Sequence, residues 1–226
     1  MLFRSVYVRY NGSNLRIQTP RMILPYGLNE DEITDTQTGE VTGYKYSVNL
    51  SFKNMDRVND DSLPSKVRNN ARRLQEFHSM LQMVDDLVVQ EGTKNSMPWL
   101  KMKAAQTAVV QALFNDTIKV SRDKQTQEPD GKWPDTFKAK IPYWDGVFKT
   151  EVYSEDRQEV DLKENVVKRA ETASLLECTG IWFAGGKFGI SWKVVQMQVL
   201  SKPSGITGFS LLPESDDEDE IGRAHV

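Results

Sequence analysis

Hydrophobic and polar residues alternate most clearly between residues 44 and 53. One set of alternate positions is apolar or aromatic: Tyr44, Tyr46, Val48, Leu50 and Phe52. The positions between them carry lysine, serine and asparagine. A period of two is typical of a β-strand with one buried face, so we predict such a strand here. A looser alternation over residues 15–24, which stops at Pro25, predicts an earlier strand.

The period changes to three and four between residues 64 and 91. Its apolar positions are Val67, Ala71, Leu74, Phe77, Leu81, Val84 and Val88. This spacing predicts a long amphipathic helix that starts after Asp61 or Ser62, at Pro64, and stops at Gly92. A shorter helix is predicted over residues 99–113, with its inward positions at Met102, Ala105, Val109 and Ala112.

Strand patterns return in the second half of the chain, after a polar loop at 121–135. Phe137, Ala139 and Ile141 alternate with Lys138 and Lys140. A turn at 143–146 leads into a predicted strand at 147–153. Residues 173–200 predict a long hairpin with its turn at 184–187, and residues 35–39 predict another turn.

The order of these elements is strands, then helices, then strands. Because strands and helices do not alternate regularly, a doubly wound sheet and a β/α barrel are excluded. The order favours a mainly β (α+β) fold, an antiparallel sheet or small barrel with helices on one side.

The composition is that of a globular protein that is not stabilised by disulfide bonds or a structural metal ion. The 226 residues are 38% hydrophobic and 27% charged. One cysteine, Cys178, and two histidines exclude a disulfide framework and a multi-cysteine zinc site. No apolar run is long enough to span a membrane, and the first residues do not open a secretory signal, so we expect a soluble intracellular protein.

The net charge of −3 conceals an uneven distribution. Residues 214–220 contain six acids in seven positions: Glu214, Asp216, Asp217, Glu218, Asp219 and Glu220. Without residues 214–226 the chain has 28 basic and 26 acidic residues. This layout fits a protein that handles a polyanion and regulates access to it, and it fits equally a tail that only confers solubility.

The residues give no support for catalysis, a metal or a cofactor. His78 lies within the predicted long helix and His225 in the tail, and Cys178 falls in a predicted strand as a core residue. The glycines at 185–186 do not have the spacing of a phosphate-binding loop. The acidic pairs Asp60-Asp61 and Asp85-Asp86 lack the partners of a metal site.

Aromatic and basic residues are interleaved in two runs of the second half. Single-stranded nucleic acids are bound by aromatic rings that stack on bases and by lysines that follow the phosphates. The candidate residues are Lys138, Lys140, Tyr143, Trp144, Trp182, Lys187, Phe188, Trp192 and Lys193. Half the positions of each strand face inward, so about half the aromatic residues are expected in the core. Lys138 and Lys140 are the better surface candidates.

The segment from Glu177 to Gln196, ECTGIWFAGGKFGISWKVVQ, resembles the C-terminal signature of a family of single-stranded DNA-binding proteins in nucleocytoplasmic large DNA viruses. Ile17-Gln18-Thr19-Pro20, Tyr26-Gly27-Leu28 and the run from Lys138 to Tyr143 resemble its other shared segments. That family is similar to the phage T-seven type (gene 2.5-like) single-stranded DNA-binding protein.

The resemblance implies an oligonucleotide-binding (OB) barrel at 1–200, with a helical insertion at about 62–113, followed by a flexible linker and acidic tail at 201–226. It implies a protein that coats and protects single-stranded DNA in replication, recombination and repair, in the host nucleus or a cytoplasmic viral factory. The tail would compete with DNA and recruit a polymerase, helicase or primase, and the chain could form a homodimer.

Two alternatives remain open at this stage: a protein-interaction or virion scaffold built on the barrel, and an RNA-binding or transcription-linked factor. The sequence also departs from phage-type tails, which close on an aromatic residue, because Ile221 to Val226 follow the acids here.

Overall fold

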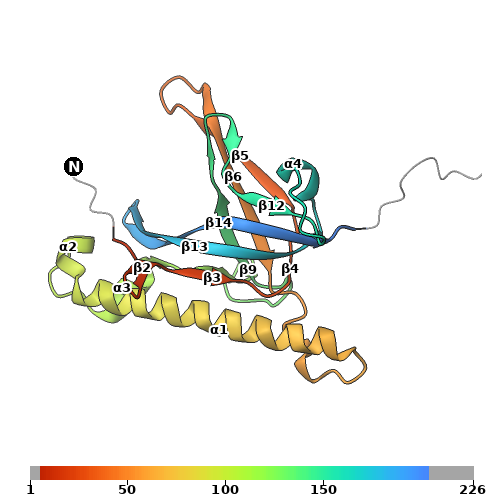
Figure 1. The fold of residues 1–226 in the computed structure, drawn as a ribbon. Coiled ribbons are helices and arrows are strands. Elements are labelled where there is room, and N and C mark those ends of the chain that lie inside the picture. The colour runs from red at the N-terminus through yellow and green to blue at the C-terminus, as the bar shows by residue number, and fades with distance from the viewer. Residues whose placement is uncertain (1–5, 204–226) are drawn as a thin grey trace, which may run out of the picture.

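The computed structural model describes residues 6–203, and its strands close into a barrel (Figure 1). The barrel strands are β3 (Arg16–Gln18), β4 (Met22–Ile23), β6 (Val41–Ser51), β9 (Thr136–Ile141), β13 (Glu171–Ala184) and β14 (Lys187–Ser201). The other strands are β1 (Arg9–Tyr10), β2 (Ser13–Asn14), β5 (Leu28–Thr34), β7 (Phe114–Asn115), β8 (Ile118–Lys119), β10 (Tyr143–Trp144), β11 (Val147–Phe148) and β12 (Glu151–Tyr153). The helices are α1 (Ser65–Lys94), α2 (Ser96–Leu100), α3 (Thr107–Leu113), α4 (Leu162–Asn165) and a 3-10 turn at Arg57–Asn59.

Hydrogen bonding between strands can be followed around the whole barrel. β13 pairs with β3 and β4, β4 pairs with β6, and β6 pairs with β9. β9 then meets β14 in parallel at Lys140 and Lys193, and β14 returns to β13. We count β3 to β5 as the first strand of the barrel, β6 as the second, β9 as the third, β13 as the fourth and β14 as the fifth. The order around the barrel is then 1-2-3-5-4-1. This is the five-stranded arrangement of an OB fold, so the predicted fold class is confirmed.

The barrel interior is filled by the alternating residues that the sequence pattern predicts. Val48 and Leu50 of β6 and Phe137 and Ala139 of β9 are each 0% exposed. Tyr44 was expected on the same face, but it is 43% exposed because its end of β6 leaves the barrel. There β6 pairs with β5, and the two strands project away from α1 (Figure 1).

Helix α1 runs beneath the barrel and buries the predicted stripe, which includes Leu74, Phe77 and Leu81 (Figure 1). The predicted stop at Gly92 is wrong, because α1 continues to Lys94. A Cβ atom at Gly92 would lie 3.2 Å from Val110 and 3.3 Å from the Phe188 ring. Gly92 therefore permits close packing and does not end the helix.

The single helix predicted over 99–113 is also wrong. The segment forms α2 and α3, separated by Lys101 and Ala104, which have left-handed backbone angles of +61° and +48°. The buried residue of α3 is Val110, whereas Val109 is 40% exposed. The predicted inward phase was therefore displaced by one residue.

The predicted turns have the expected chemistry. Asp35 accepts hydrogen bonds from the backbone N–H groups of Gln37 (2.7 Å) and Thr38 (2.9 Å). Gly185 and Gly186, with φ of +58° and +74°, form the two-residue connection of the β13–β14 hairpin. The strand predicted at 15–24 is divided into β3 and β4, and the acidic stretch after it forms β5, which the sequence pattern did not predict.

Candidate nucleic-acid interface

Two lysines project from β9 on the outer surface of the barrel. Lys138 and Lys140 are exposed, and they alternate with buried residues as predicted. The Lys140 ammonium group donates to the Ser191 hydroxyl at 3.1 Å, and Lys138 pairs with Asp31 at 3.4 Å. Lys193 of β14 lies directly beside Lys140 in the strand pairing. The third and fifth strands of the barrel thus present their lysines side by side.

This row of charges continues onto β13 and β3 through a buried carboxylate. Glu177, which is 4% exposed, lies between Lys193 and Arg16 in the pairing. Lys193 contacts it at 2.8 Å and Arg16 at 2.7 Å. The hydrogen bond from Lys193, and then that from Arg16, holds the pKa of Glu177 below its usual value. Glu177 therefore fixes two cations that remain partly exposed.

A second group of cations lies where β9 and β14 diverge. The short strands β7 and β8 occupy this space, β7 pairing with β14 and β8 with β9. Lys119 donates to Asn115 at 2.8 Å. Partial burial lowers the pKa of Lys119, and the neighbouring charges of Lys187 and Arg122 lower it further, against the opposing effect of Asp116 and Asp85. We refer to the outer surface that carries Arg16, Lys119, Lys138, Lys140, Lys187 and Lys193 as the basic face.

Trp182 supplies an aromatic ring beside these cations. It pairs with Gly189 across the hairpin and is half-buried. A Cβ atom at Gly189 would lie 2.9 Å from Cζ2 of the indole, so only glycine lets the ring lie against β14 at this position. Such a ring can stack on an unpaired base.

The structure brings together five of the nine predicted residues: Lys138, Lys140, Trp182, Lys187 and Lys193. Tyr143 and Trp144 follow β9 on a separate small sheet, the β10–β11 hairpin. Tyr143 packs edge-on against Tyr46, with ring centroids 4.9 Å apart, while Trp144 is 63% exposed.

Phe188 and Trp192 were predicted at the interface, and this prediction is wrong in the described structure. Phe188 is 0% exposed and stacks on Phe183 with ring centroids 5.9 Å apart. Trp192 is 2% exposed and packs edge-on against Phe137. A base cannot stack on a ring that is already enclosed, so both residues belong to the core.

Sequence patterns missed Arg16 and Lys119. Arg16 alternates with Leu15 and Ile17 in the loosely predicted first strand, which is a usable signal for an outward position. Lys119 belongs to a strand of two residues, too short for any alternation to appear. The predicted acidic tail residues, Glu214, Asp216, Asp217, Glu218, Asp219 and Glu220, lie outside the described residues.

Four further features of residues 6–203 concern metal ions, membrane-spanning helices, His78 and Cys178. No group of three or more histidine, cysteine or acidic residues within that range could hold a metal ion. None of the helices there has the length and apolar character needed to cross a membrane. His78 is bonded to Asp135 at 3.0 Å, and Cys178 is buried with its pKa raised by that burial, as a core residue should be.

A buried carboxylate anchors the segment that carries Lys119. Asp85 of α1 accepts hydrogen bonds from the backbone N–H of Thr117, at 2.8 Å, and from its hydroxyl group. Burial is the main cause that raises the pKa of Asp85, to about 6. The loop between β7 and β8 is therefore tied to the helix by an acid that titrates near neutral pH.

We expect Asp85→Asn to remove a pH-dependent part of the stability. The folded pKa of about 6 exceeds the reference value of 3.8, so this contribution is fully present below pH 3.8 and is lost as the pH rises through 6. The difference of about 2 between the folded and unfolded pKa values of Asp85 corresponds to roughly 3 kcal/mol of free energy of unfolding. Urea unfolding at several pH values should show wild type losing up to this amount relative to Asp85→Asn. The exposed neighbour variant Asp86→Asn should follow wild type, and parallel curves for wild type and Asp85→Asn would contradict the assignment.

Similar folds occur among solved phage proteins. The single-stranded DNA-binding protein of bacteriophage Enc34, solved with single-stranded DNA, is 13% identical over 90% of this chain and 100% of that chain, with a TM-score of 0.44. The single-stranded DNA-binding protein gp2.5 of bacteriophage T7 is 9% identical over 95% of this chain and 100% of that chain, with a TM-score of 0.47.

No curated protein matches the chain in sequence. One protein family does match it, over residues 66–208, and this match runs from α1 to the end of the β13–β14 hairpin and beyond. The chain therefore belongs to the family of unknown function DUF5871.

Proposed function

We propose that this protein binds single-stranded DNA on the basic face. The observation that carries the proposal is the adjacent placement of Lys138, Lys140 and Lys193 on the third and fifth strands of an OB barrel. The outer surface of the second and third strands, with the loops that flank it, is where OB folds bind oligonucleotides. Phosphates would contact these lysines, and a base would stack on Trp182.

The kinds of side chain on this surface favour a single strand bound without strong sequence preference. Lysine is a point charge that neutralises phosphate, whereas base reading in a duplex uses bidentate arginine, asparagine and glutamine in a groove. A half-buried indole can reach only a base that has left its partner. We propose that the protein coats and protects DNA exposed during replication, recombination or repair in a large DNA virus. The resemblance of the β13–β14 hairpin sequence supports that setting.

Fluorescence anisotropy with labelled oligo-dT, the equivalent RNA and a duplex tests the proposal. Single-stranded DNA should bind most tightly, and the affinity should fall steeply with salt. Each phosphate contact on a single strand contributes about −0.7 to the slope of log affinity against log salt. If each of the five lysines of the basic face contacts one phosphate, the slope should be about −3.5. Preference for RNA would favour an RNA-binding factor. Failure to bind any nucleic acid would favour an interaction scaffold.

We expect deletion of residues 214–226 to tighten DNA binding several-fold at low salt. The support is the sequence alone, six acids within seven positions of the same chain. A tethered acidic segment can reach an effective concentration in the millimolar range, and it would compete with phosphates for the same lysines. The gain should shrink as salt rises, because screening acts over roughly 10 Å at 0.1 M.

A variant of the same length, in which the six acids are replaced by asparagine and glutamine, separates charge from the loss of chain. It should bind as tightly as the truncated protein. Equal affinities of the full-length, truncated and neutralised proteins would leave the tail a role in docking replication proteins or in solubility only.

A further inference from the structure

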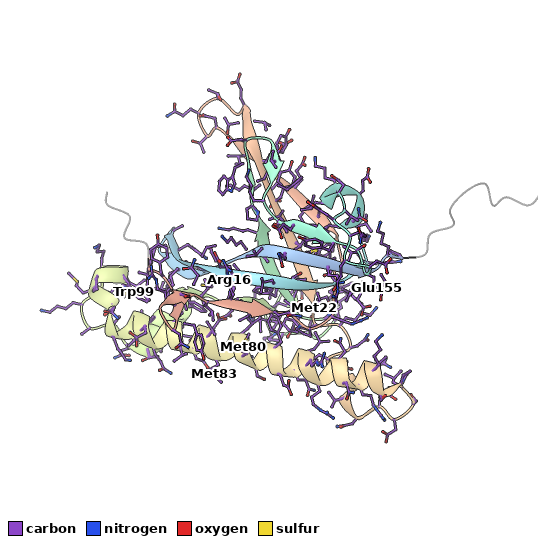
Figure 2. All side chains as sticks on the ribbon, viewed as in Figure 1. Arg16, Met22, Met80, Met83, Trp99 and Glu155 are labelled. Carbon is purple, nitrogen blue, oxygen red and sulfur yellow. The ribbon has the colours of Figure 1, made fainter. Side chains whose placement is uncertain are left out.

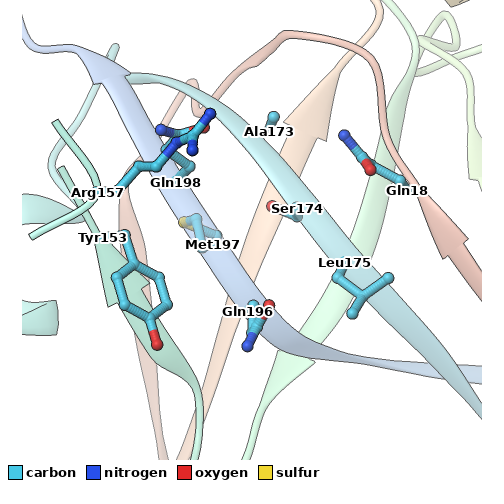
Figure 3. A pocket seen from close by; sticks show the side chains of 9 residues that line it. All are labelled: Gln18, Tyr153, Arg157, Ala173, Ser174, Leu175, Gln196, Met197 and Gln198. Carbon is cyan, nitrogen blue, oxygen red and sulfur yellow. The ribbon is translucent and has the colours of Figure 1, made fainter. Parts of the chain in front are cut away.

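A cavity of about 400 Å³ lies on the outer surface of β13 and β14 (Figure 3). Leu175 lines it from β13, and Gln196 and Gln198 line it from β14. Gln18 of β3 lies on one side, and Tyr153 and Arg157 lie on the other. Volumes of this size are typical of small-ligand sites.

The cavity adjoins the basic face along the strands β3, β13 and β14. Glu177 of β13 pairs with Arg16 and Lys193, and two residues away Leu175 pairs with Gln18 and Gln196. Side chains two positions apart on a strand share a face, so Glu177 and Leu175 point to the same side of β13. Their partners on β14, Lys193 and Gln196, are three positions apart, and the register shift between Leu175 and Leu176 keeps both on the outer surface. Figure 2 shows Arg16 at this junction, beside β13. A strand of DNA on Lys193 and Arg16 would therefore reach the cavity without leaving the sheet surface.

The amide groups of the cavity are arranged to accept hydrogen bonds. The Gln198 amide nitrogen donates to the carbonyl oxygens of Ser154, at 3.2 Å, and Glu155, at 3.1 Å. The Gln196 amide nitrogen donates to Glu151 at 2.6 Å. Both N–H groups of Gln198 and one of the two of Gln196 are therefore occupied, which leaves the Oε1 atoms of both residues to accept bonds from a ligand.

The charges around the cavity favour a base over a phosphate group. Glu151 also accepts a bond from the Tyr153 hydroxyl at 3.1 Å, and Glu155 and Asp156 precede Arg157 in the adjoining turn. The Glu151 carboxylate, which is bonded to Gln196 of the cavity, disfavours a bound phosphate, and the acidic residues of the adjoining turn offset the charge of Arg157. A neutral base offers an apolar face to Leu175 and to the ring of Tyr153, and polar edges to the amides.

We propose that this cavity is a subsite for one unstacked base that carries an exocyclic amino group, such as cytosine or adenine. The inference rests on the proposed function, because the strand on the basic face delivers the base. Cytosine presents an N4 amino donor where thymine presents the O4 acceptor, so an acceptor-rich cavity separates the two pyrimidines.

Anisotropy titrations of oligo-dC and oligo-dT of equal length, at pH 7.5, test the subsite. Wild type should bind oligo-dC about threefold to tenfold more tightly, a range that corresponds to one or two hydrogen bonds. Leu175→Trp, which fills the cavity, and Gln196→Leu, which removes one of the two assigned acceptors, should abolish the preference and leave oligo-dT affinity within twofold. Gln37→Leu, an exposed amide in the β5–β6 turn, is the matched control and should keep the preference.

Equal affinity of wild type for the two oligonucleotides, or a preference that survives both cavity variants, would overturn the subsite and leave the proposed function standing. Absence of binding to either oligonucleotide would overturn both. Photocrosslinking gives a second measurement: oligo-dT with a single 5-iododeoxycytidine should crosslink to the peptide that contains Tyr153. A crosslink found only elsewhere would also overturn the subsite.

Discussion

Replacing both Lys138 and Lys140 with alanine should weaken single-stranded DNA binding by roughly 10- to 100-fold. Each lysine would lose a hydrogen bond to a charged phosphate, which contributes about 1.5 kcal/mol or more before screening by salt reduces it. Both side chains are exposed on β9. The slope of log affinity against log salt should become shallower by about 1.4, because two phosphate contacts are lost. The melting temperature should hardly change, since exposed substitutions usually alter stability by no more than about 0.5 kcal/mol.

The matched control removes the same charge from a different surface. Lys66 and Arg73 are exposed on α1, and Lys66→Ala with Arg73→Ala should leave both the affinity and the salt slope near wild type. If the control weakens binding as much as the β9 variant, binding depends on overall charge and the basic face is not a specific site. If the β9 variant unfolds, the assigned outward direction of its lysines is wrong.

The alternation on β9 shows why part of the interface could be predicted. Its register is regular from Thr136 to Ile141, so a period of two in the sequence corresponds to a period of two in space. The same rule applied to β14 groups Phe188 and Trp192 with Ile190 and Val194, opposite Lys187 and Lys193. The alternation of β14 was therefore enough to place both rings in the core, whereas the expectation that about half the aromatic residues lie inside did not say which ones.

Strand β13 shows where such counting fails. Leu176 and Cys178 point inward, and so do Ile181 and Phe183, although the interval between the two pairs is odd. The register shifts between Cys178 and Gly180, where Gly180 has a φ of +125°. This bulge turns Trp182 to the outer surface. A Cβ atom at Gly180 would lie 2.7 Å from the carbonyl oxygen of Val6, so the bulge depends on a contact with a distant segment.

The position of Lys119 on the basic face could not be predicted from the sequence for a different reason. Its strand has two residues, and its position is set by pairing with Thr136 and by the bond between Asp85 and Thr117. These partners lie far apart in the chain, and none of them carries a local signal for an outward lysine. Short strands inserted where two longer strands diverge are fixed by their surroundings.

Replacing Trp192 with alanine should lower the free energy of unfolding by about 3–5 kcal/mol, a large part of the roughly 5–15 kcal/mol typical of a protein. Trp192 is 2% exposed, and its ring centroid lies 6.0 Å from that of Phe137. Trp182→Ala should instead cost little stability and weaken DNA binding by about 1–3 kcal/mol, the contribution of one stacked base. Urea unfolding and anisotropy on both variants give the comparison.

Trp192→Phe separates the volume of the ring from its polar atom. The indole N–H of Trp192 is buried without a hydrogen-bond partner among the described residues, a condition that costs about 1–3 kcal/mol. Phenylalanine removes that donor and keeps most of the apolar contact, so Trp192→Phe should be far closer to wild type in stability than Trp192→Ala. DNA affinity of the folded Trp192→Phe protein should be unchanged. A stable Trp192→Ala protein that had lost DNA binding would instead mean that Trp192 reaches the DNA through an opening of the barrel, and that the stacking role predicted from the sequence was correct.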